Sequence, residues 1–87
     1  MCTTISSKDP ASGSGKGRDG WFSLDHAYVG YDHPTHVQLE HAVSIDFVNE
    51  EAGPGARVAV ELSRESALAL AERLLETVAE ADAYEAR

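Results

Sequence analysis

Two histidines, His26 and His41, carry the most specific chemical signal, because both fall at apolar positions of segments that alternate with period two. If Tyr31 pairs with His36 across a tight turn at 32–35, the numbers of paired residues add up to 67 and His26 lies opposite His41. Opposed side chains of an antiparallel pair have Cβ atoms about 4.5–5.5 Å apart. Two imidazoles at that spacing form either a hydrogen-bonded core pair or two ligands of one metal ion.

Three further residues could join such a site. Cys2 becomes the N-terminal residue if Met1 is removed, and its α-amine and thiol could then chelate a metal or act as an N-terminal nucleophile. The alternative is that Cys2 is a small apolar residue of a short edge strand. His33 and His36 lie in DHPTH at the expected hairpin tip, where HxxH without CxxC or HExxH indicates a metal only weakly.

The strands and the helix that position these residues are predicted from alternating and helical patterns of apolar residues, and their order predicts an α+β fold, β-β-β-α. The expected antiparallel meander is covered on one face by a C-terminal helix, with a fourth N-terminal edge strand as an option. Ser63 is the expected N-cap, with Glu65 in the first turn. The predicted ranges within a single domain 1–87 are 2–6, 21–31, 36–49 and 56–62 for the strands and 64–83 for the helix.

Residues 7–20, SKDPASGSGKGRDG, are rich in glycine and serine and are expected to form a loop. The GSGKG run suggests a phosphate-binding loop, since glycines free backbone N–H groups and Lys16 adds a positive charge. Pro10 stands where the first glycine of that motif should be, and Gly17 replaces the magnesium-binding Ser or Thr. We therefore expect a flexible loop rather than a nucleotide site.

Composition limits the classes of partner. The net charge of −8 argues against nucleic acid and anionic membranes as partners. The chain has no apolar run of about 18 residues, no signal-peptide pattern and one cysteine, so we expect a cytoplasmic protein. A chain this short buries only about 60% of its unfolded surface. We therefore expect a homodimer formed through a sheet edge or through the mixed outer sheet face, which comprises Trp21, Val29, Tyr31, Ala42, Val48 and Ala59.

Several motifs together resemble a family of short actinobacterial proteins of unknown function. They are the Met-Cys-Thr start, GSGKGxxGWF, DHPTH, EHAVSIDFVN and GPGARVAVELS followed by an alanine-rich helix. The resemblance covers nearly the whole chain. It implies the boundaries of one domain and no activity.

These observations favour a small metal-binding protein in which His26 and His41 are the central ligands of zinc or another divalent transition metal. Cys2 would be the third ligand, and His33 or His36, from the hairpin tip or from a partner subunit, would complete the site. One alternative is a metal-free interaction or accessory module that dimerises through the outer sheet face. A second alternative is a small-molecule-binding enzyme with a pocket between sheet and helix, in which the histidine pair performs acid–base chemistry.

Overall fold

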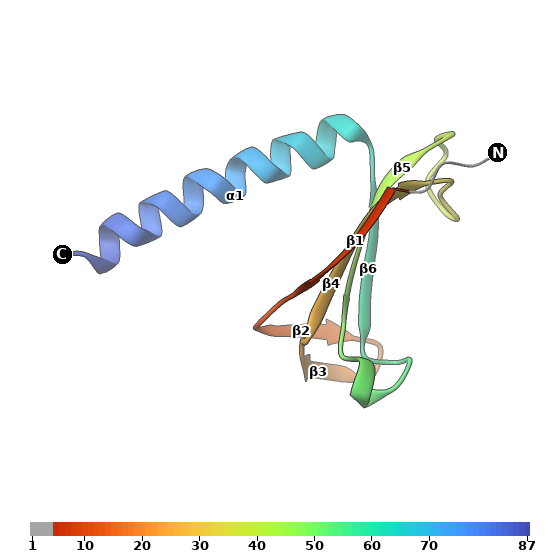
Figure 1. Ribbon diagram of the computed structural model, residues 1–87, viewed down its shortest axis with the longest axis horizontal. Coiled ribbons are helices and arrows are strands. Elements are labelled where there is room, and N and C mark those ends of the chain that lie inside the picture. The colour runs from red at the N-terminus through yellow and green to blue at the C-terminus, as the bar shows by residue number, and fades with distance from the viewer. Residues whose placement is uncertain (1–4) are drawn as a thin grey trace.

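The computed structural model describes residues 5–87, which form two antiparallel sheets and one long helix (Figure 1). The main sheet has the strand order β1-β4-β5-β6, and β2 and β3 form a separate hairpin. The fold is α+β as predicted, and β1 is the N-terminal edge strand. The elements are β1 (Ile5–Pro10), β2 (Ser14–Gly17), β3 (Gly20–Ser23), β4 (His26–Asp32), β5 (Ala42–Val48), the 3-10 helix η1 (Glu50–Ala52), β6 (Arg57–Leu62) and α1 (Arg64–Glu85).

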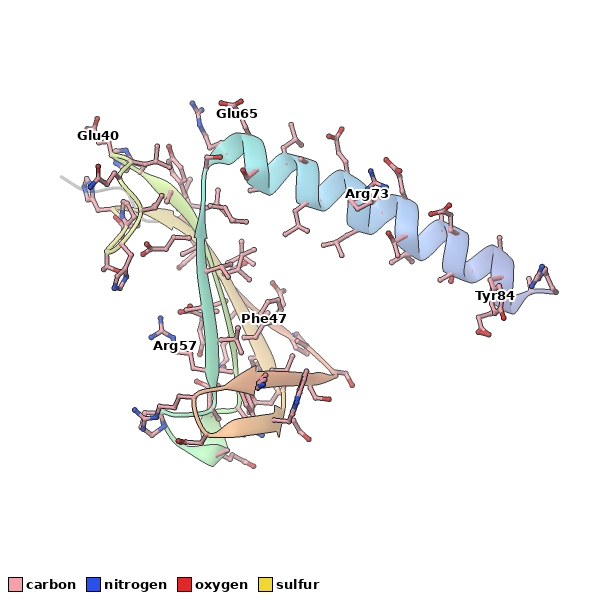
Figure 2. The ribbon with its side chains drawn as sticks, turned by 180° about the vertical axis from the view of Figure 1, so that it is seen from behind. Glu40, Phe47, Arg57, Glu65, Arg73 and Tyr84 are labelled. Atoms are coloured by element: carbon pink, nitrogen blue, oxygen red, sulfur yellow. The ribbon has the colours of Figure 1, made fainter. Side chains whose placement is uncertain are left out.

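The main sheet has one apolar and one polar face, because successive side chains point to opposite faces of a strand. Val29 pairs with Ile45, which pairs with Val60, so these three residues share the apolar face. Figure 2 shows Phe47 on the side toward which α1 extends and Arg57 on the other side. The polar face carries Lys8, His26, Tyr28, Asp46, Arg57 and Glu61.

The predicted register of the central hairpin is wrong. Residue numbers of paired positions in β4 and β5 add up to 74, as in His26 with Val48, and not to 67. The connection is the loop 33–41 rather than a tight turn, so the ladder is displaced by an odd number of residues. An odd displacement turns every β4 side chain to the other face relative to β5. The expected outer face is therefore divided between the apolar face (Val29, Tyr31), the polar face (Ala42, Val48, Ala59) and the separate hairpin (Trp21).

The predicted loop at 7–20 is also wrong, because it contains most of β1 and all of β2. β1 pairs along the edge of β4 through its backbone and all its residues are exposed, so it needs no apolar pattern. The glycines of β2 permit close packing rather than flexibility. A Cβ on Gly17 would lie 2.8 Å from the carbonyl oxygen of Gly55, and one on Gly15 would lie 3.3 Å from Val58 Cγ2. The β2–β3 hairpin thus packs onto the apolar face at the β6 end farthest from α1.

Helix α1 begins where predicted, since the Ser63 side chain accepts a hydrogen bond from the Ser66 N–H at 3.1 Å. The helix does not cover the sheet, however. It extends away from the sheet after its first turn (Figure 1), and Ala67 is its only residue that is not exposed. Among residues 5–87, the buried hydrophobic residues are only Ala42 and Ala56. Ser63 alone joins β6 to α1, which leaves no wider turn to bring the helix back over the sheet.

Within the described part of the chain, no helix has a stretch that is long and apolar enough to cross a membrane.

Candidate functional site

A cluster of polar side chains lies where β4 begins and β5 ends. The Asp25 N–H donates to the carbonyl of Val48 at 2.9 Å, which extends the ladder by one bond. The chain then turns into η1, and the Glu50 N–H donates to the Asp25 carboxylate at 3.2 Å. This turn brings the carboxylate of Glu50 back beside His26, so Asp25, His26 and Glu50 have ligand atoms that all lie within 4.8 Å of one another.

His26 lies between the two carboxylates. Its Nδ1 is 3.2 Å from Asp25 Oδ1 and 3.3 Å from Glu50 Oε1. Both distances are in the range of an ion pair, yet the angles fit no hydrogen bond, and this nitrogen is shielded from solvent although about a third of the side chain (32%) is exposed. A buried polar atom without a hydrogen bond is costly, so Nδ1 is the least satisfied polar atom of the cluster.

Glu50 is also held by two residues of the polar face. Lys8 Nζ of β1 lies 2.8 Å from Glu50 Oε1, and the Tyr28 hydroxyl of β4 donates to Oε2 at 2.7 Å. The hydrogen bond from Lys8, followed by that from Tyr28, lowers the pKa of Glu50. The pKa of Lys8 is raised by its interaction with Glu50 and then by that with Tyr28. Glu50 therefore stays a carboxylate, and the cluster connects β1, β4 and η1.

The predicted pairing of His26 with His41 is wrong. His41 precedes Ala42, which pairs with Asp32, whereas His26 pairs with Val48. The two histidines lie at opposite ends of the β4–β5 ladder, about 20 Å apart at about 3.3 Å per residue. The expected central metal site is thus not formed by this pair, and Cys2 lies outside the described residues.

The structure brings His41 together with His33 instead, in the loop 33–41. Their rings stack with centroids 4.6 Å apart, and His41 also stacks on Tyr31 at 5.4 Å. His33 Nδ1 lies 3.0 Å from the Glu40 carbonyl oxygen, which fixes the ring inside the loop. Stacked rings present their faces to each other, so this arrangement packs the loop rather than directing two nitrogens at one ion.

His36, the last of the predicted ligands, lies where Glu61 holds the same loop. The Glu61 carboxylate accepts hydrogen bonds from the N–H groups of Thr35, His36 and Val37 at 2.8–3.1 Å and from the Thr35 hydroxyl at 2.9 Å. These bonds, with the backbone of Thr35 and Val37 foremost, lower the pKa of Glu61 to about 2. His36 Nδ1 is 2.8 Å from Thr35 Oγ1.

An open groove of about 690 Å³ runs beside this loop over the polar face. Its lining includes Asp46 and Arg57, which pair at 3.1 Å, together with His36 and Glu61. The expected pocket between sheet and helix had the pair His26 and His41 at its centre, and neither residue lines this groove.

Sequence reasoning missed Asp25 and Glu50 as neighbours of His26. The acid–histidine dipeptide at 25–26 was visible, and so was the turn at 50–55. In the observed register, however, position 25 faces position 49, and this places Glu50 beside the start of β4. The register was therefore the missing information.

Fold and cluster together define a small α+β protein with a polar cluster at one end of an antiparallel sheet and an apolar face that its own helix leaves open. The chain belongs to DUF6295, a family of unknown function whose model matches residues 1–87. The predicted membership of a family of unknown function is confirmed. No curated protein and no solved structure matches the chain significantly.

Proposed function

We propose that this protein binds one divalent transition-metal ion, such as zinc, between Asp25, His26 and Glu50. The observation that carries the proposal is the position of His26 Nδ1, which is 3.2 Å and 3.3 Å from one oxygen of each carboxylate and has no hydrogen bond. Two ligands that lie about 2.1 Å from one ion and subtend about 90–109° are about 3.0–3.4 Å apart. These two separations suit a common metal better than a hydrogen bond.

The donor set suits this class of ion. One imidazole nitrogen and two carboxylate oxygens are ligands that zinc and its neighbours in the first row accept. The Tyr28 hydroxyl would orient Glu50 from behind, as outer-shell groups do in metal sites. Three protein ligands would leave a position open to water or to a small ligand, and the exposed side of Glu50 gives access to it.

Lys8 would compete with the metal ion. Its ammonium lies 2.8 Å from Glu50 Oε1, the oxygen nearest to His26, and like charges would repel. The Lys8 side chain is nearly half exposed, so it can turn into solvent when an ion binds. Metal affinity should therefore rise when Lys8 is replaced by an uncharged residue of similar length.

Calorimetric titration of untagged, chelator-treated protein with zinc chloride tests the proposal. We expect one ion per chain, tighter binding by Lys8→Met, and a loss on His26→Ala larger than the about 10–100-fold that removal of an outer-shell partner costs. His36→Ala removes a histidine from the other end of the sheet and serves as the matched control, with unchanged binding. A wild-type chain that binds no zinc, or equal losses in the two histidine variants, would contradict the proposal.

A further inference from the structure

The accessible surface of this chain is larger than that of a compact protein that remains alone. Its accessible surface is 6826 Å², whereas a compact monomer of 9.3 kDa exposes about 5,000 Å². The radius of gyration is 14.8 Å, compared with about 12 Å for a compact domain of 87 residues. The excess of about 1,800 Å² exceeds the about 800 Å² that each partner buries in a standard interface, and it fits an obligate dimer.

Two exposed apolar surfaces contribute to this excess. The first is the part of the apolar sheet face beyond the β2–β3 hairpin, where Val29 is 41% and Val60 40% exposed. The second is one side of α1, where apolar residues recur at helical spacing from 67 to 81, and where charges appear only at the two ends, at Arg64 and near Asp82. This stripe comprises Ala67, Leu68, Leu70, Ala71, Leu74, Leu75, Val78 and Ala81, and Leu74 near its centre is 55% exposed.

The apolar face of a sheet and the apolar stripe of a helix are each stable only when another element buries them, and packing the one against the other buries both. We propose that α1 of a second copy of this chain covers the apolar sheet face, and that α1 of the first copy covers the face of the second. A two-fold axis satisfies both surfaces in both chains and closes the assembly at two. The helix already extends away from its own sheet, on the side of the apolar face (Figures 1 and 2).

The connection between β6 and α1 favours a second copy over an unrelated protein. Ser63 is the only residue between the two elements, and short connections that cannot fold back promote exchange of an element between identical chains. The proposal does not depend on the metal site, since His26 lies on the polar face of the sheet.

Light scattering after size-exclusion chromatography measures the mass of the particle in solution and so tests whether the chain is a dimer. The wild-type chain should have twice its mass of 9.3 kDa. Leu74→Glu on the helix and Val29→Glu on the sheet should each abolish the dimer, although both replace side chains that are about half exposed in the single chain. Ala69→Glu adds the same charge on the opposite side of α1 and should leave the dimer intact.

Mixing the two disruptive variants distinguishes a dimer in which each helix covers the partner's sheet from a dimer with any other interface. In a dimer of Leu74→Glu with Val29→Glu, both changes fall in one helix–sheet contact, and the other contact is wild type. The two variants, refolded together, should therefore form a dimer that neither forms alone, even if each is unfolded by itself. A wild-type monomer, an assembly larger than two, a dimeric Leu74→Glu variant, or a mixture without heterodimer would overturn the inference.

Discussion

Gly17→Ala should destabilise the protein, because β2 approaches the chain around Gly55 more closely than a side chain allows. The new Cβ would lie 2.8 Å from the Gly55 carbonyl oxygen, 3.1 Å from the Phe22 ring and 3.3 Å from the Arg57 carbonyl oxygen. Two of these three atoms belong to the backbone, so the hairpin must move by about 0.5 Å to reach normal contact. Such overpacking costs about 1–3 kcal/mol, from which about 0.4–1 kcal/mol is recovered because alanine restricts the unfolded chain.

We expect a net loss of about 1–2 kcal/mol, or about 4–16 °C in Tm for a domain of this size. Gly15→Ala is the matched control, two residues earlier on the same face of β2. Its nearest atoms are the side-chain methyl groups Leu24 Cδ2 at 3.2 Å and Val58 Cγ2 at 3.3 Å, and neither contact is as short as the 2.8 Å contact with backbone at Gly17. Urea unfolding followed by circular dichroism, at one protein concentration, compares the two. A Gly17→Ala variant as stable as Gly15→Ala would refute the reasoning.

Three further predictions concern the polar contacts. The pKa of Glu61 is lowered from 4.5 to about 2, so the stabilisation of the loop 35–37 by its carboxylate should be complete above about pH 4.5 and lost as the pH falls toward 2. Amide exchange of that loop should increase over this pH range in the wild type and show no such pH dependence in Glu61→Gln. Ser63→Ala removes the N-cap of α1 and should cost about 1 kcal/mol in urea unfolding, whereas Ser63→Asp should cost little. Asn49→Ala breaks bonds to the Ser23 carbonyl (2.8 Å) and the Glu51 N–H (3.0 Å), and increased amide exchange at the start of η1, without change in α1, should report it.

Local signals predicted local structure well. The N-cap at Ser63, the helix that follows it and the strand 57–62 depend on neighbours in sequence, and the structure has them where the pattern indicates. The alternation of Val43, Ile45 and Phe47 correctly placed these residues on one face.

The register of β4 and β5 could not be found in the same way. The period-two pattern continues through Val37 and Leu39 into His41, and it suggests a strand where the chain forms a loop. What holds that loop is the carboxylate of Glu61, more than twenty residues away, with hydrogen bonds to the backbone of 35–37. Such a long-range contact leaves no periodic signal. The error then carried over to the candidate site, because the neighbours of His26 follow from the register.

The position of Glu61 gives the loop 33–41 a mechanical link to the helix. Glu61 lies two residues before Ser63, so the strand end that holds the loop is also the strand end from which α1 emerges. The residue that holds the loop with His33, His36 and His41 is therefore separated from the first residue of α1 by only two residues, Leu62 and Ser63. We expect a partner that binds α1 and shifts its first turn to shift the loop as well, and so to change the edge of the groove beside His36.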